Sequence, residues 1–240
     1  MNKIIALWAH PRSLSTAFER MILERGDFFV MHEPFCTLAD TGSYSVILPD
    51  GKEYTVNSYE NLIDLIYEIS KSRKIFFKET TDHRYDILLK NNEFLGNIIN
   101  TFIIREPSKT INSHYAMNNN VTCNEIGYEN LYEIFNYVIE LTSKIPVVIE
   151  ADMLISNPKR CIKEYCQRIG INFIDEALTW DSKNISEWKI TQKWHIDAMK
   201  SIGFNEVEKQ YLVRVNNNDK LKEFYDYNLE FYEYIYKYHI

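Results

Sequence analysis

Short, almost wholly apolar runs recur along the chain, separated by longer amphipathic stretches. Each run is only four to six residues long. Continuous apolar runs of this length are typical of strands that are buried on both faces of a parallel sheet. The pattern therefore predicts strands over Ile4–Ala9, Phe28–Met31, Lys74–Lys78, Asn100–Ile104 and Ile145–Ile149.

The stretches between these runs have helical periodicity and recognisable ends. Gly26 should end a helix over Thr16–Arg25, because glycine readily takes the left-handed conformation after a last helical turn. Tyr59–Ser70 repeats apolar residues on one side, as an amphipathic helix does. Two further helices are expected to begin at Pro107 and at Asn157-Pro158, since proline suits the first helical turn, and the second should end at Gly170.

Repeated strand–helix units predict an α/β fold with a parallel sheet flanked by helices on both faces. The sequence has no internal repeat or linker, so a single domain over residues 1–240 is expected. The C-terminal stretch 224–238 is rich in tyrosine and phenylalanine, and it should form a helix that packs on the domain by its aromatic side.

Residues 36–57 have little helical signal. Val46–Leu48 and Tyr54–Val56 flank Pro49-Asp50-Gly51, a turn sequence suited to a β-hairpin. We expect this hairpin to be an insertion near the ligand-binding edge of the sheet.

The net charge of −7 argues against general affinity for nucleic acid, which requires an extended basic face. A small polyanionic ligand is still compatible with it. The four cysteines have no metal-ligand spacing and should be free thiols, and no metal site is expected. No apolar stretch is long enough for a signal peptide or a membrane span, so we expect a cytoplasmic protein.

The first strand is followed directly by the turn sequence His10-Pro11-Arg12-Ser13-Leu14-Ser15-Thr16. A turn between a strand and a helix presents unpaired backbone N–H groups at the positive end of the helix dipole, which favours an anion. Arg12 adds a forked cation, and the hydroxyls of Ser13, Ser15 and Thr16 add donors. The ATP- and GTP-binding pattern GxxxxGK[ST] is absent, since no glycine precedes Gly26.

A second polar segment follows another predicted strand. Phe102–Ile104 leads into Arg105-Glu106-Pro107, and Ser113 comes eight positions after Arg105. In open α/β sheets ligands bind at the carboxyl ends of the strands. Both polar segments should therefore lie at the same edge of the sheet.

Together these segments resemble PAPS-dependent sulfotransferases of the bacterial type. The Arg12 turn is similar to the family's 5′-phosphosulfate loop, and Arg105 with Ser113 is similar to its 3′-phosphate motif. Residues 150–158 resemble the acidic turn and helix start of the same family, and 170–173 are a weaker match. Two features differ: Leu14 stands where the family has a small glycine, and no glycine-rich adenine-side segment is found near the C-terminus.

The resemblance implies a P-loop-like fold and PAPS as the sulfuryl donor, with PAP as the product. It implies that a small-molecule acceptor offers a hydroxyl or an amine. Arg12, Ser13, Leu14, Ser15 and Thr16 would bind the phosphosulfate, and Arg105 and Ser113 would bind the 3′-phosphate.

The general base has three candidates. Glu33 and His32 end the second predicted strand, beside the first loop, and the bacterial branch often has a glutamate at this point. Only one of the two should face the acceptor, because neighbouring residues of an extended chain point to opposite sides. His83 follows the third strand, after Lys78, in a region where the family often carries a lysine and a histidine. Farther along the chain, Trp188, Trp194 and His195 are candidates for the wall of an acceptor pocket, although core packing suits the tryptophans better.

Two other functions remain open from the sequence. Val147–Asp152 also has the form of a metal-binding Walker B strand, which keeps a P-loop phosphotransferase or nucleotide kinase possible. A nucleotide-binding protein that has this fold without catalytic activity is the other alternative, because fold alone does not confer function.

Overall fold

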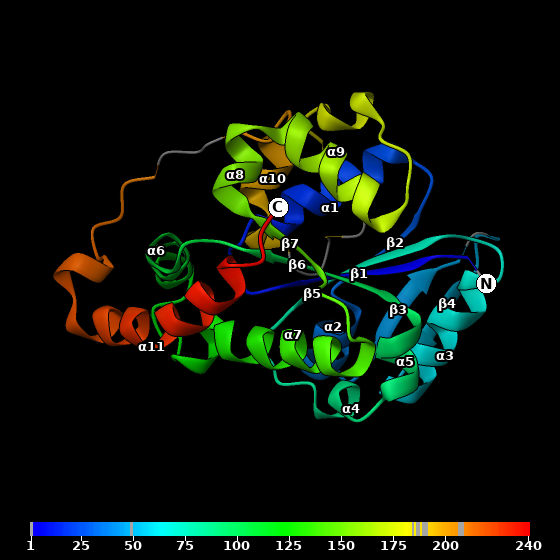
Figure 1. The fold of residues 1–240 in the computed structure, drawn as a ribbon, viewed down its shortest axis with the longest axis horizontal. Coiled ribbons are helices and arrows are strands. Elements are labelled where there is room, and N and C mark those ends of the chain that lie inside the picture. Colours follow the sequence, from blue (N-terminus) through cyan, green and yellow to red (C-terminus); the bar gives the residue numbers. More distant parts are fainter. Residues whose placement is uncertain (1, 49, 184, 186–187, 189–191, 206–208) are drawn as a thin grey trace.

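The computed structural model describes residues 2–48, 50–183, 185, 188, 192–205 and 209–240. Its centre is a five-stranded sheet with the strand order β2-β5-β1-β6-β7, in which every neighbouring pair is parallel (Figure 1). The α/β prediction is thereby confirmed. The strands are β1 (Ile4–Ala9), β2 (Phe29–His32), β5 (Ile75–Thr80), β6 (Ile99–Ile104) and β7 (Val147–Glu150).

The pairing register places the ends of the strands together. Ala9, the last residue of β1, pairs with Thr80 on one side and with Ile103 on the other. His32 at the end of β2 pairs with Lys78. As a result, the segments that follow these strands all leave the sheet at one edge.

Helices cover both faces of the sheet (Figure 1). Successive residues of β1 point to opposite sides, and each side belongs to a separate apolar core. One core is completed by α2 (Pro34–Thr41), α3 (Tyr59–Ser70), α5 (Asn92–Asn97) and α7 (Tyr128–Thr142). The other is completed by α1 (Ser15–Arg25), α8 (Ala151–Ser156) and α9 (Pro158–Ile169). The remaining helices are α4 (Asp86–Leu89), α6 (Pro107–Met117), α10 (Ile196–Lys200) and α11 (Asp219–Tyr236).

The predicted helix ends are confirmed by their capping groups. Gly26 follows α1 with φ 69°, and Gly170 follows α9 with φ 68°. The side chain of Asn157 accepts a hydrogen bond from the amide of Arg160 at the start of α9. α6 begins at Pro107, as expected.

The prediction that residues 36–57 contain little helix is wrong for α2. This short helix begins at Pro34, and its first amides are bound by a carboxylate far away in the sequence. Glu79 accepts from the amides of Phe35 at 2.7 Å and of Cys36 at 3.1 Å. A helix that depends on such a long-range partner leaves only a weak local signal.

The hairpin prediction is confirmed. β3 (Tyr44–Ile47) and β4 (Glu53–Val56) pair antiparallel, with Tyr44 opposite Val56. Pro49 of the predicted turn lies outside the described residues.

The aromatic C-terminal helix packs as predicted. Tyr232 of α11 makes an edge contact with Tyr128, and Phe231 and Tyr234 contact Tyr132 of α7. The chain end is held to the sheet by a hydrogen bond from the amide of Ile240 to the carbonyl of Val148, 3.1 Å long. Within the described residues, no helix is long and apolar enough to cross a membrane.

Gly127, just before α7, provides a test of the packing beneath the site. Its φ is 88°, and a Cβ there would lie 2.9 Å from the carbonyl oxygen of Thr81 and 3.0 Å from Cδ of Pro11. We expect Gly127→Ala to reduce the free energy of unfolding by about 2–5 kcal/mol, the sum of left-handed strain and steric overlap.

Gly96→Ala is the matched control, because Gly96 lies in α5 and its added Cβ would meet Leu141 at an ordinary 3.7 Å. It should leave stability unchanged or raise it by about 0.5–1 kcal/mol. Urea unfolding of both variants measures the difference, and equal stability of the two would contradict this account.

Candidate functional site

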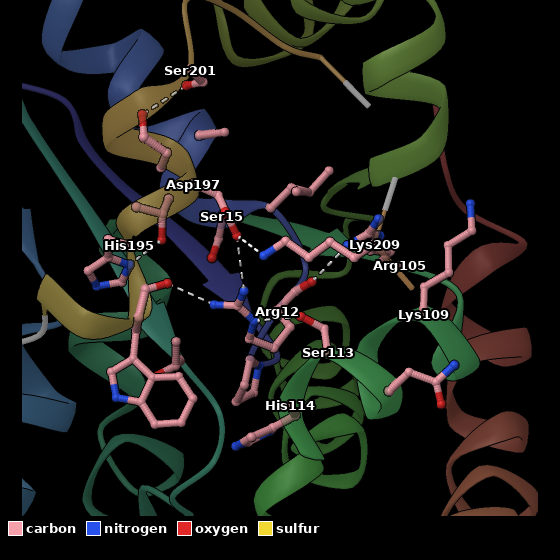
Figure 2. A pocket seen from close by; sticks show the side chains of 18 of the residues that line it. Arg12, Ser15, Arg105, Lys109, Ser113, His114, His195, Asp197, Ser201 and Lys209 are labelled. Atoms are coloured by element: carbon pink, nitrogen blue, oxygen red, sulfur yellow. Dashed lines mark hydrogen bonds and ion pairs between the residues drawn. The ribbon is translucent and has the colours of Figure 1, made fainter. Parts of the chain in front are cut away.

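A cavity of about 580 Å³ opens at the carboxyl edge of the sheet (Figure 2). Its walls come from the turn between β1 and α1, the end of β5, the first turns of α6 and the segment that surrounds α10. The hairpin was expected near this edge, but none of its described residues lines the cavity. The site is therefore built on the main sheet and on a segment from the C-terminal part of the chain.

The turn after β1 has an unusual backbone. Arg12 and Leu14 adopt φ values of 67° and 70°. Leu14 thus occupies the left-handed conformation that glycine takes without strain. This conformation accounts for the small glycine at the corresponding position of the sulfotransferase loop that this turn resembles. Leu14, Ser15 and Thr16 line the cavity, whereas Ser13 is fully buried and its hydroxyl has no hydrogen-bond partner among the described residues.

Arg12 connects the two predicted phosphate motifs. Its Nε donates to Oγ of Ser113 at 3.0 Å, so the first loop and α6 are in direct contact (Figure 2). Its Nη1 donates to the carbonyl of Trp194 at 2.8 Å, and its Nη2 lies 3.8 Å from Asp197. The guanidinium therefore ties its own loop to two other parts of the chain, α6 and the segment 194–197.

Arg105 is fixed to the same loop by its backbone and its side chain. Its amide donates to Nε2 of His10 at 3.0 Å, and its Nη1 donates to the carbonyl of Arg12 at 3.5 Å. Because Nε2 of His10 accepts, the proton of this imidazole is on Nδ1, 3.0 Å from the carbonyl of Pro11. Burial lowers the pKa of His10 to about 3, so the ring is neutral and acts as a spacer between the two motifs.

Cations outnumber carboxylates among the described residues that line the cavity, although the whole chain carries −7. In the described part of the chain, the carboxylates that pair with the cations near the two motifs are Asp152 and Asp197: Lys109 lies 2.7 Å from Asp152, and Lys209 pairs with Asp197. Such a local excess of positive charge suits a ligand with several negative charges. The cations that line the cavity near the two motifs are Arg12, Arg105, Lys109, Lys209 and Arg214.

Glu33, the first candidate base, lies in the cavity wall. It is buried, follows β2 with φ 43°, and its Oε1 pairs with the buried ammonium of Lys78. Its Oε2 lies 3.3 Å from Nε2 of His32. Burial alone would raise the pKa of Glu33, but Lys78 and His32 outweigh it and hold the pKa well below its usual range.

His32 lies behind this wall in a chain of polar contacts. Its Nδ1 is 2.7 Å from Oε2 of Glu19, and its Nε2 is 3.1 Å from Nε2 of His195. Burial lowers the pKa of His32, whereas Glu19 and Glu33 raise it, with a net result of about 9. His195, which lines the cavity, contacts the hydroxyl of Thr16 at 3.1 Å, and burial and Lys78 lower its pKa to about 2.

His83 lies apart from this cluster. Its side chain is 42% exposed and bonds Asp40 at 2.8 Å, and it is not among the described residues that line the cavity. The structure therefore gathers two of the three candidate bases and leaves His83 outside.

Several site residues had no clear signal in the sequence. Glu19 lies within α1, where it reads as an ordinary amphipathic position, and it accepts from Nε1 of Trp188 at 3.2 Å. Lys109 and Lys209 read as solvated lysines. Trp194 and His195 line the cavity, in agreement with their prediction as candidates for the wall of an acceptor pocket. Trp188, the third candidate, is fully buried.

The expectation of free thiols is confirmed for all four cysteines. Linear spacing suggested no metal site. The folded chain nevertheless brings together two groups of side chains of metal-ligating type, each with its ligand atoms within 4.8 Å of one another. These groups are His32, Glu33 and His195, and Cys36, Asp40 and His83.

Known proteins match this chain in sequence. Over 211 residues it is 25% identical to branched-chain-amino-acid aminotransferase-like protein 2 of Arabidopsis thaliana, and 23% identical to the like-named protein 1. Each alignment covers 86% of this chain but 37% of the relative, so the chain spans little more than a third of their length.

Solved structures match the fold. The sulfotransferase domain from the curacin biosynthetic pathway has a TM-score of 0.52 at 14% identity, covering 85% of this chain and 84% of its own. The sulfotransferase domain from the Synechococcus PCC 7002 olefin synthase has a TM-score of 0.53 at 11% identity, covering 94% of both chains. A family model described as a sulfotransferase domain matches residues 2–235, nearly the whole sequence, and the chain therefore belongs to the sulfotransferase domain family.

Proposed function

We propose that this protein transfers the sulfuryl group of PAPS to a hydroxyl or amine of a small acceptor. The observation that carries the proposal is the hydrogen bond from Arg12 to Ser113 at the cationic cavity. It joins the loop that resembles a phosphosulfate site to the motif that resembles a 3′-phosphate site. PAPS carries both of these groups, whereas ordinary adenine nucleotides lack the 3′-phosphate.

The donor would lie with its phosphosulfate at the start of α1. There the free amides of the helix, the hydroxyls of Ser15 and Thr16 and the guanidinium of Arg12 would oppose its negative charge. When the acceptor oxygen or nitrogen attacks sulfur, the bond from sulfur to the bridging phosphate oxygen breaks and PAP leaves. The charge that grows on this oxygen would be balanced by the same donors.

The acceptor must also lose a proton. Glu33 is the group we assign to this step, because it lines the cavity and its Oε2 is not the oxygen engaged by Lys78. Lys78 keeps the carboxylate in the ionised form that accepts a proton and fixes its orientation, but by lowering the pKa of Glu33 it also makes this group a weaker base. Its ammonium also lines the cavity, where it can interact with the transferring group.

The rival assignment, a P-loop phosphotransferase, fits the structure less well. The acidic residues at the end of β7 make structural contacts: Oε2 of Glu150 accepts from the amide of Met153 at 2.8 Å, and Asp152 lies 2.7 Å from Lys109. In a P-loop NTPase the Walker B carboxylate holds Mg²⁺ beside the phosphates, and neither Glu150 nor Asp152 is among the described residues that line the cavity.

Arg12→Ala should weaken the binding of PAP by about 1.5–3 kcal/mol, the range for charge-assisted hydrogen bonds. Calorimetric titration measures the change. Arg84→Ala is the control. Arg84 is an exposed arginine whose Nε lies 3.0 Å from Oε2 of Glu133, and it is not among the described residues that line the cavity. Unchanged PAP affinity in Arg12→Ala would remove the loop from the donor site.

Arg105→Ala should erase most of a preference for PAP over ADP. These two ligands carry the same number of phosphates, so the comparison tests where the second phosphate is bound: at the 3′ position in PAP or at the β position in ADP. The wild type should bind PAP about ten- to a hundredfold more tightly, which corresponds to one or two charge-assisted contacts. Equal affinity of the wild type for PAP and ADP would overturn the proposed donor.

Glu33→Gln should lower turnover by about 10²- to 10⁴-fold, the contribution of a general base, while PAP affinity stays nearly unchanged. Glutamine still accepts a hydrogen bond from Lys78, so the buried ammonium is not left without a partner. Transfer of label from radioactive PAPS to a panel of hydroxyl and amine acceptors measures turnover. His83→Ala, at the exposed histidine, should keep most of the activity, and the reverse order of the two variants would move the base to His83.

A further inference from the structure

His32, Glu33 and His195 present three potential ligand atoms to a common point. Nε2 of His32 lies 3.1 Å from Nε2 of His195 and 3.3 Å from Oε2 of Glu33. All three side chains are buried, and they come from two segments far apart in the sequence. Two imidazole nitrogens and a carboxylate oxygen form a ligand set that proteins use for divalent transition metals.

The outer contacts of both histidines strengthen this comparison. Nδ1 of His32 faces Oε2 of Glu19 at 2.7 Å, and Nδ1 of His195 faces the hydroxyl of Thr16 at 3.1 Å. Each ring is therefore oriented by an oxygen at one nitrogen and turns the other nitrogen to the shared point, where a metal ion would replace the proton that the His32 imidazole carries at neutral pH. Histidine ligands of metal ions are held in this way, with Nδ1–H bonded to a carboxylate or another oxygen.

We propose that His32, Glu33 and His195 bind one divalent transition-metal ion, with Zn²⁺ the best match. Ligand bonds of about 2.0–2.1 Å in a tetrahedral zinc site place neighbouring ligand atoms about 3.3 Å apart. The two distances above differ from that value by no more than a few tenths of an ångström. Mg²⁺ and Ca²⁺ fit less well, because they prefer oxygen ligands.

Because Glu33 is also the proposed base, a metal ion bound to it would affect sulfuryl transfer. Oε1 pairs with Lys78, so Oε2 is the oxygen available to the metal. On the proposed function, the same oxygen receives the proton of the acceptor. Metal and acceptor proton therefore compete, and Zn²⁺ inhibits sulfuryl transfer without displacing PAP.

Titration of the metal-stripped wild type with Zn²⁺, followed by calorimetry, tests the site without any sulfuryl donor. One equivalent should bind. His195→Ala should weaken binding by more than about 100-fold, since even the loss of an outer-shell partner costs 10–100-fold. His83→Ala removes a residue of the second group, formed with Cys36 and Asp40, and should leave the affinity for Zn²⁺ unchanged.

Co²⁺ provides a readout that does not depend on the folding of a variant. Its visible absorption in the wild type should be intense, as for tetrahedral coordination, and Zn²⁺ should bleach it. Failure of the wild type to bind either ion, or loss of binding in His83→Ala but not in His195→Ala, would overturn the site. Such a failure would leave the proposed sulfuryl transfer standing, because that proposal rests on PAP binding and turnover.

Discussion

The parallel pairing of β1 with β5 and β6 is the constraint on which the rest of the structure depends. It aligns Ala9, Thr80 and Ile103, so that the chain leaves three central strands at one level. Arg12, Asp82 and Arg105 come within a few residues of these ends, and all three line the same cavity. Hydrogen bonds of the sheet thus fix the positions of these charged side chains, including Arg12 and Arg105, which as like charges repel each other.

The site also holds charges that are costly to bury. Lys78 and Glu19 are fully buried, and each is paired with a residue at the end of β2. A buried ion pair adds little net stability, because the loss of hydration offsets the attraction, but removal of one partner is strongly destabilising. These pairs therefore act mainly to fix geometry: Lys78 orients Glu33, and Glu19 orients His32.

The parts of the site that could be predicted from the sequence are those with a local cause. Arg12 and Arg105 directly follow apolar runs, and such positions lie at the ligand edge of a parallel sheet whatever else the chain does. The link of His195 to His32 could not be predicted, because 163 residues separate them and only tertiary packing brings their rings together. The place of His83 after β5 favours a catalytic role, but its half-exposed side chain bonds Asp40 and is not among the described residues that line the cavity. α2 was missed for a similar reason, since its first amides depend on Glu79.

The contact between Arg12 and Trp194 uses the backbone carbonyl of Trp194, not its indole. Any residue at position 194 can supply that carbonyl, while the side chain at the same position forms part of the cavity wall. The backbone of residue 194 therefore anchors Arg12, while its side chain independently shapes the cavity. Substitutions at this position can reshape the space offered to an acceptor while the anchoring of Arg12 is preserved, which makes position 194 a place where selectivity can diverge between relatives at small cost to the donor site.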